Sequence, residues 1–104
     1  MKIIFEKQYL EDLYTEGKAK KYIFQKDVVR KYKQTIDKLR VATRIEDLFV
    51  INSLNYEVLS GKKDGISSVR VDRKYRIEFK VLLEGQEPHT ITICSIMELS
   101  NHYK

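Results

Sequence analysis

The chain has 104 residues, 42% of them apolar and 34% charged, which predicts one domain spanning residues 1–104 around a single modest core. No apolar run approaches the roughly 18 residues of a membrane span, and MKIIFEKQ at the N-terminus carries charge too early for a signal peptide, so a cytoplasmic protein is expected. The net charge of +5 is concentrated in residues 18–44 and 62–80, which predicts a polyanionic partner without choosing between RNA, DNA and an acidic protein.

The first half of the chain has helical spacing. Residues 2–5 (KIIF) are either a short strand or the lead into a first helix, which is expected to end at Gly17. The segment DVVRKYKQTIDKLRVA, residues 27–42, predicts a longer helix with one apolar stripe. This stripe consists of Val28, Val29, Tyr32, Ile36, Leu39 and Val41.

The second half has strand-like patterns. From Tyr56 onward the segments YEVL, ISSVRV, YRIEFKVLL and HTITICSIM are separated by the turn segments GKKDG, DRK and EGQEP. Helices followed by consecutive strands predict an α+β fold, in which an N-terminal helical pair covers one face of a mostly antiparallel sheet and leaves the other face open. Cys94 lies in the apolar run ITICSI with no cation beside it, so a buried structural thiol is expected.

The hairpin SVRVDRKYRIEF, residues 68–79, places two arginines on one face. A three-residue turn at residues 72–74 pairs Val71 with Tyr75, and it pairs Arg70 with Arg76. The turn lacks the usual glycine, so a five-residue turn stays open. Two opposed guanidinium groups on an unburied face cost roughly 0.2–1 kcal/mol, which an anion bound between them would reverse. In the alternative, each arginine pairs with a nearby carboxylate and nothing binds.

Three segments resemble the HigB-type toxins of the RelE superfamily, which belong to bacterial type II toxin-antitoxin systems. LSGKKDGISSVRVDRKYRIEF is similar to the core signature of that family. KDVVRKYKQTIDKLRVATRIEDL resembles its long helix and the segment before the sheet, and ELSNHYK resembles its histidine-bearing tail. The segments follow one another in the family's order from about residue 20 to residue 104, and they imply a RelE-like fold with a curved sheet.

The resemblance implies an endonuclease that cleaves mRNA on the ribosome without a metal ion. In this chemistry the RNA 2′-hydroxyl attacks the adjacent phosphorus, so a base, an acid and cations near the phosphoryl oxygens are needed. Arg76 is expected to be the main phosphate clamp and Arg70 the second, because a guanidinium keeps its charge and matches two phosphoryl oxygens. The residues expected to bind the RNA are Lys62, Lys63, Arg73, Lys74 and Asn101.

The C-terminal tail supplies the expected acid and base. His102 has an ordinary pKa near 6.5 and suits either role, and Tyr103 is expected to stack on a base or assist proton transfer. The tail departs from the usual order of the family, in which tyrosine precedes histidine, so the sequence leaves open which residue is the acid. His89, in EPHT, is expected to be a loop residue.

The sequence also gives expectations about cofactors and binding partners. The sequence contains no HExxH, CxxC, P-loop or GxGxxG motif, so no metal or nucleotide cofactor is expected. The resemblance implies a helix-turn-helix antitoxin of the HigA kind, with operator DNA contacted only through that antitoxin. Two other functions remain open: a ParE-like toxin that binds gyrase without catalysis, and an RNA-binding module with the same arginines.

Overall fold

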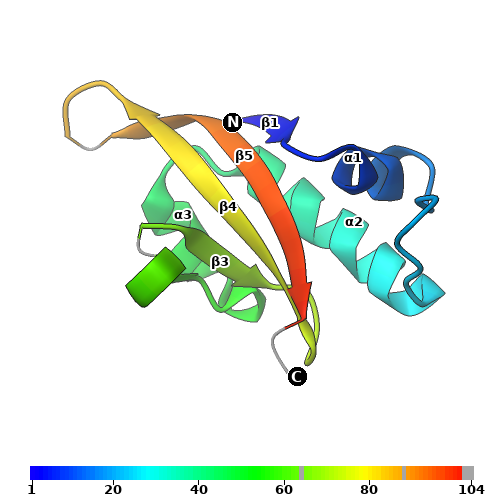
Figure 1. The fold of residues 1–104 in the computed structure, drawn as a ribbon. Helices are drawn as coiled ribbons and strands as arrows, with labels where there is room; N and C mark the ends of the chain where they lie inside the picture. Colours follow the sequence, from blue (N-terminus) through cyan, green and yellow to red (C-terminus); the bar gives the residue numbers. More distant parts are fainter. Residues whose placement is uncertain (64, 88, 102–104) are drawn as a thin grey trace.

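The computed structural model describes residues 1–63, 65–87 and 89–101 (Figure 1). The helices are α1 (Gln8–Thr15), α2 (Lys26–Val41) and α3 (Ile45–Val50), with short 3-10 turns η1 (Asn52–Leu54) and η2 (Gly61–Lys63). The strands are β1 (Lys2–Phe5), β2 (Glu57–Val58), β3 (Ser67–Arg70), β4 (Tyr75–Glu84) and β5 (Thr90–Asn101). Among these residues, no helix is both long and apolar enough to cross a membrane.

One five-stranded sheet has the order β1-β5-β4-β3-β2. Residues 2–5 form a strand that pairs with β5 in parallel, and the other neighbouring strands pair antiparallel. This arrangement confirms the predicted α+β fold with a mostly antiparallel sheet. Beyond the ends of β1 and β3, the β4–β5 hairpin continues as a two-stranded arm that projects from the molecule (Figure 1).

The helices cover one face of this sheet, behind β4 and β5 in the view of Figure 1. The hydroxyl of Tyr32 in α2 donates to the carbonyl oxygen of Leu10 in α1 at 2.7 Å, which joins the two helices inside the core. Cys94 is fully buried, and this burial raises the pKa of its thiol to about 12, as expected of a structural cysteine. Val41 was wrongly placed in the apolar stripe, because it is the last residue of α2 and is 75% exposed.

Helix α3 was not predicted from the sequence. Its six residues are too few to show a period, and Leu48 is the only one of them that is buried. The Asp47 side chain accepts hydrogen bonds from the backbone N–H groups of Thr43 and Arg44, which satisfies donors just before the helix. The segment thus forms a helix through local capping and one buried leucine.

The β3–β4 hairpin has the predicted three-residue turn. Arg70 pairs with Arg76, and the backbone N–H of Val71 donates to the carbonyl oxygen of Tyr75 at 3.0 Å. The Asp72 side chain accepts from the backbone N–H groups of Lys74 and Tyr75, both at 2.8 Å. Asp72 therefore stabilises a turn without glycine, since an aspartate can bond to the backbone a few residues later in the chain.

Candidate functional site

Arg76 lies on the same face of the sheet as Arg70, but the expectation that this face is unburied is wrong for Arg76. The residue is 8% exposed, and its Nε donates to Ser68 Oγ at 2.6 Å. Its Nη2 donates to the carbonyl oxygens of Asn55 at 2.7 Å and Ser68 at 3.3 Å. Within the described residues Nη1 has no hydrogen-bond partner, so the guanidinium is fixed along one edge and offers the other.

Glu57 is a site residue that the sequence did not reveal. Its Oε1 lies 3.6 Å from Arg76 Nη2, and its side chain is about half exposed. Burial, together with the charge of Arg70, lowers the pKa of Arg76, whereas Glu57 acts to raise it. Glu57 was missed because it lies outside the arginine hairpin, in the two-residue strand β2 that pairs with β3.

A cavity of about 490 Å³ adjoins Arg76, and we call it the arginine cavity. Its lining comes from η2 and the residues before it, from β3 and β4, and from the end of β5, where Ser100 is the ladder partner of Arg76. The lining residues are Leu59, Ser60, Lys62, Lys63, Ser68, Arg76, Glu78, Ser100 and Asn101. The structure therefore brings together four of the predicted site residues, namely Arg76, Lys62, Lys63 and Asn101.

The lysines of η2 have different surroundings within the arginine cavity. Lys63 Nζ contacts both carboxylate oxygens of Glu78, at 2.8 and 3.1 Å. Lys62 is exposed and forms no ion pair in the part of the chain that the structure describes. Lys63 is thus oriented by an almost buried carboxylate, whereas Lys62 is the more available cation at the rim.

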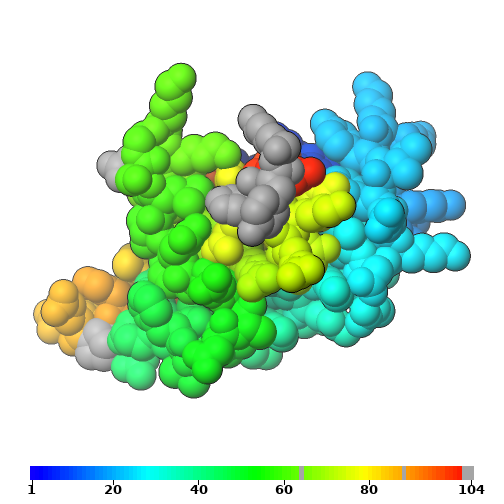
Figure 2. Space-filling model, turned by 90° about the horizontal axis from the view of Figure 1, so that it is seen from below, coloured from blue at the N-terminus to red at the C-terminus, as the bar shows by residue number. Residues whose placement is uncertain are grey.

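The other predicted residues lie elsewhere. Arg70, Arg73 and Lys74 line a second cavity on the far side of the hairpin end. In Figure 2 the hairpin (yellow) lies between the segment around residues 50–63 (green) and the start of α2 (cyan). His102 and Tyr103 fall outside the described residues. His89 is exposed and its Nδ1 lies 2.8 Å from the Gly85 carbonyl oxygen, as expected of a loop residue.

A carboxylate network lies beside the arginine cavity. Glu98 is the ladder partner of Glu78, and it accepts hydrogen bonds from the Tyr9 hydroxyl and, at 2.6 Å, from Lys7 Nζ. Partial burial acts to raise the pKa of Glu98, but the hydrogen bonds from Lys7 and Tyr9 outweigh it and the pKa is lowered. This network fixes β5 against the start of α1.

We expect Glu98→Gln to reduce the loss of stability in acid. A carboxyl group with a lowered pKa in the folded state stabilises the fold above its unfolded pKa, here about 4.5, and this contribution is lost as the pH falls through the lower folded pKa. Urea unfolding at pH 7 and at pH 3 measures the change in unfolding free energy, which should be smaller in Glu98→Gln than in the wild type. Glu87→Gln, in the exposed β4–β5 loop, is the control. An equal loss of unfolding free energy between pH 7 and pH 3 in all three proteins would contradict a stabilising role of the Glu98 carboxylate.

The arginine cavity is chemically suited to bind a phosphodiester. It holds a fixed guanidinium and two lysines, and Ser68, Ser100 and Asn101 line the same space. Within the described residues, no group of three or more histidine, cysteine, aspartate or glutamate side chains is placed to hold a metal ion. The guanidinium, the lysines and the hydroxyl and amide groups of the lining favour recognition of an anionic oxygen by charge-assisted hydrogen bonds.

Solved toxin structures share this fold. A "YoeB/ParE toxin" from Agrobacterium tumefaciens has a TM-score of 0.54 and 15% identity, with 99% of this chain and 100% of that chain covered. The YoeB dimer from Staphylococcus aureus has a TM-score of 0.53 and 18% identity. The YoeB-YefM complex from the same organism has a TM-score of 0.51 and 19% identity. Each of these two comparisons covers 99% of this chain and 98% of the other chain. At these identities the likeness defines the class of fold, an α+β toxin fold.

The family is shown by sequence. No curated protein matches the chain, but a family model described as "RelE-like toxin of type II toxin-antitoxin system HigB" matches residues 3–96. The chain therefore belongs to this family of HigB-like toxins, as the resemblance implied. Toxins of this family are generally endoribonucleases.

Proposed function

We propose that this toxin is an endoribonuclease that cleaves mRNA on the ribosome and so inhibits translation. The observation that carries the proposal is the arginine cavity, in which a guanidinium fixed by Ser68 and Asn55 faces the same space as Lys62, Lys63 and Asn101. A guanidinium held in place before the substrate arrives stabilises charge on phosphoryl oxygens without reorganising during the reaction. Family membership supports the same reaction class.

The proposed reaction uses side chains of this chain alone. The 2′-oxygen forms a bond to phosphorus while the bond from phosphorus to the 5′-oxygen breaks, which leaves a 2′,3′-cyclic phosphate and a 5′-hydroxyl. Arg76, through its Nη1 edge, and Arg70 offset the charge that builds on the phosphoryl oxygens. Lys62, Lys63, Arg73, Lys74 and Asn101 hold the RNA.

Proton transfer is assigned to the tail. His102 and Tyr103 directly follow Asn101, which lines the arginine cavity at the end of β5. One of the pair takes the proton of the 2′-hydroxyl and the other gives a proton to the departing 5′-oxygen. Their order in this tail does not assign the two roles, and the pH dependence of cleavage by single variants would.

The proposed partners follow from the family and the charge. The toxin acts in the cytoplasm on ribosome-bound mRNA and is silenced by a helix-turn-helix antitoxin of the HigA kind, through which alone it contacts operator DNA. The S. aureus structure of a YoeB-YefM complex supports a toxin-antitoxin pairing for this fold. The basic residues on the exposed side of α2, Lys31, Lys33, Lys38 and Arg40, suit either ribosomal RNA or an acidic antitoxin segment.

The test is to express the toxin in bacterial cells and map the ends of cellular RNA. The wild type should arrest growth and leave RNA fragments with 5′-hydroxyl ends. The double variant His102→Ala with Tyr103→Phe should lower the cleavage rate at least 100-fold, the lower end of the range for general acid–base catalysis. Arrest that persists in this variant would show binding without catalysis, and DNA breaks beside intact transcripts would favour gyrase as the target.

A further inference from the structure

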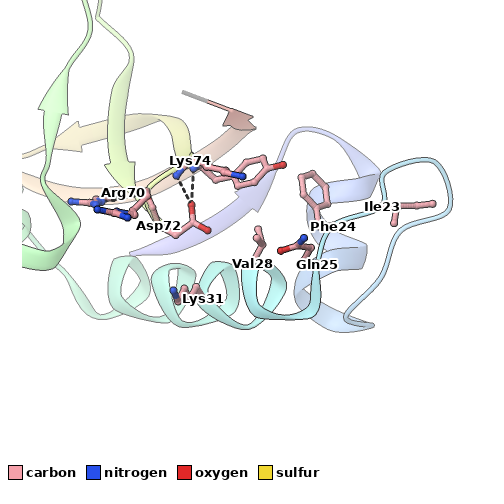
Figure 3. Close-up of a pocket in the computed structure, with 10 residues that line it drawn as sticks. Ile23, Phe24, Gln25, Val28, Lys31, Arg70, Asp72 and Lys74 are labelled. Atoms are coloured by element: carbon pink, nitrogen blue, oxygen red, sulfur yellow. Dashed lines mark hydrogen bonds between the residues drawn. The ribbon is translucent and has the colours of Figure 1, made fainter. Parts of the chain in front are cut away.

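The second cavity, of about 480 Å³, lies between the β3–β4 turn and the start of α2 (Figure 3). In the close-up, Phe24 and Val28 lie on the helix side, and Asp72 and Lys74 lie on the side of the turn. Its volume is within the range of small-molecule sites, about 300–1,000 Å³. We call it the turn cavity, and the cleavage chemistry proposed above makes no use of its helix side.

One wall of the turn cavity is apolar and aromatic. The rings of Phe24 and Tyr75 meet edge to face, with centroids 5.5 Å apart and planes at 76°. Val28 is buried beside them, and Ile23 at the mouth is 94% exposed. A wall of this kind suits a flat, apolar ring, because aromatic side chains bind bases through their faces and edges.

The remaining lining is cationic. Lys31, Arg70, Arg73 and Lys74 line the turn cavity, and Asp72 is the one carboxylate among the lining residues that the structure describes. Asp72 is already engaged by two backbone N–H groups of the turn. Asp27, one helical turn before Lys31, lies 3.3 Å from Lys31 Nζ at the surface. The cavity therefore combines an apolar wall with an excess of positive charge, which matches a ligand with a flat ring and an anionic group.

The turn cavity and the arginine cavity are each lined by one member of the same pair of opposed residues. Arg70 lines the turn cavity, Arg76 lines the arginine cavity, and the two arginines are directly opposed on neighbouring strands. The Cα atoms of opposed residues in antiparallel strands lie about 4.5–5.5 Å apart. An RNA chain with a phosphate over this pair of arginines can therefore place the base of an adjoining nucleotide in the turn cavity.

We infer that the turn cavity binds one base of the RNA, that of a nucleotide next to the phosphate held by Arg76. The inference rests on the proposed function, because it takes the phosphate in the arginine cavity as its reference point. Lys31 and Lys74 contact the backbone of that nucleotide, while Phe24 and Tyr75 contact its ring. The site adds a base contact to a cavity that otherwise recognises only the phosphate.

The test uses the exposed position of Ile23 and the burial of Cys94. In Ile23→Cys the new thiol is accessible to maleimide, while Cys94 at 0% exposed is shielded by the fold. The probes are a short single-stranded RNA with a 2′-O-methyl group at each position to block cleavage, the same oligonucleotide with one base removed at successive positions, and poly-glutamate of equal charge. The control is Val50→Cys, which is also highly exposed but lies on α3, away from the turn cavity.

We expect the intact oligonucleotide to slow maleimide reaction of Ile23→Cys about tenfold at a concentration that saturates binding, and to leave Val50→Cys unchanged. Removing one particular base should weaken binding at least about fivefold, the lower end of the range for loss of a stacked base. Phe24→Leu, which keeps the apolar volume and removes the ring, should abolish this dependence on the base while the protein stays folded.

The inference is overturned if the base-deleted oligonucleotides or poly-glutamate protect the thiol as well as intact RNA does. The turn cavity would then recognise negative charge alone, which an acidic protein segment also carries. The inference is also overturned if RNA gives no protection. Cleavage plays no part in this measurement. Base-dependent protection with no RNA cleavage by the wild type would therefore reject the proposed function and keep the base site, and cleavage without such protection would do the reverse.

Discussion

Arg76→Ala is expected to lower the rate of RNA cleavage about 100- to 1,000-fold, as does loss of one preorganised donor at other catalytic sites, and to stop growth arrest. The same change should reduce the free energy of unfolding by about 1.5–3 kcal/mol, because Ser68 and Asn55 lose a charged hydrogen-bond donor in a buried place. Relief of the repulsion from Arg70 offsets only about 0.2–1 kcal/mol of this loss. A fully exposed arginine would have left the stability almost unchanged.

Two further variants separate activity from stability. Lys80→Ala removes a positive charge from an exposed position on the same strand and should leave both cleavage and unfolding near the wild-type values. Arg76→Lys keeps the charge but cannot reach Ser68 and Asn55 with one planar group, so it should remain well below wild-type activity. Cleavage is measured at a temperature where urea titration shows every variant folded. Wild-type activity in folded Arg76→Ala would remove Arg76 from the mechanism.

Phe79→Ala is expected to cost about 3–5 kcal/mol of unfolding free energy, a large part of the 5–15 kcal/mol that stabilises a typical domain. Phe79 is fully buried at the centre of the sheet, where the centroid of its ring lies 6.4 Å from the ring centroid of Tyr56. A cavity would remain where the ring was, because a packed core relaxes only partly around a missing side chain. Tyr75 is only partly buried, so Tyr75→Ala should cost less than Phe79→Ala.

The matched control for Phe79→Ala is Leu82→Ala, on the same strand but half exposed and beyond the end of β3. This change should alter the unfolding free energy by no more than about 0.5 kcal/mol, as is usual for surface positions. Denaturant unfolding followed by circular dichroism gives both values. Similar losses in the two variants would mean that the core does not centre on this face of the sheet.

The hairpin shows how far alternation along the sequence predicts structure. Parity alone fixed the pairing of Arg70 with Arg76, because a shift of one residue would have put valines and arginines on the same face. Parity does not predict how deeply a side chain lies. Arg76 is covered by Asn55 and Glu57, which lie about twenty residues earlier in the chain and have no pattern that links them to the hairpin.

Other differences from expectation have equally local causes. The turn at residues 72–74 needs no glycine, because none of its three residues has a positive φ angle. Strand β5 continues to Asn101, so the ELSN segment belongs to the sheet, and its last two residues, Ser100 and Asn101, line the arginine cavity. The last predicted strand stopped at Met97, because polar residues on the open face of a strand look like loop residues when read alone.

Strand β5 lies between β1 and β4, yet it is the last of the five strands in the chain. A nascent polypeptide therefore has no sheet that joins its two halves until synthesis has passed residue 101, and Ser100 and Asn101 reach Arg76 only then. Pairing between segments so distant in sequence is slow to form compared with helices. It follows that cotranslational folding can complete the arginine cavity only after residue 101 has been synthesised.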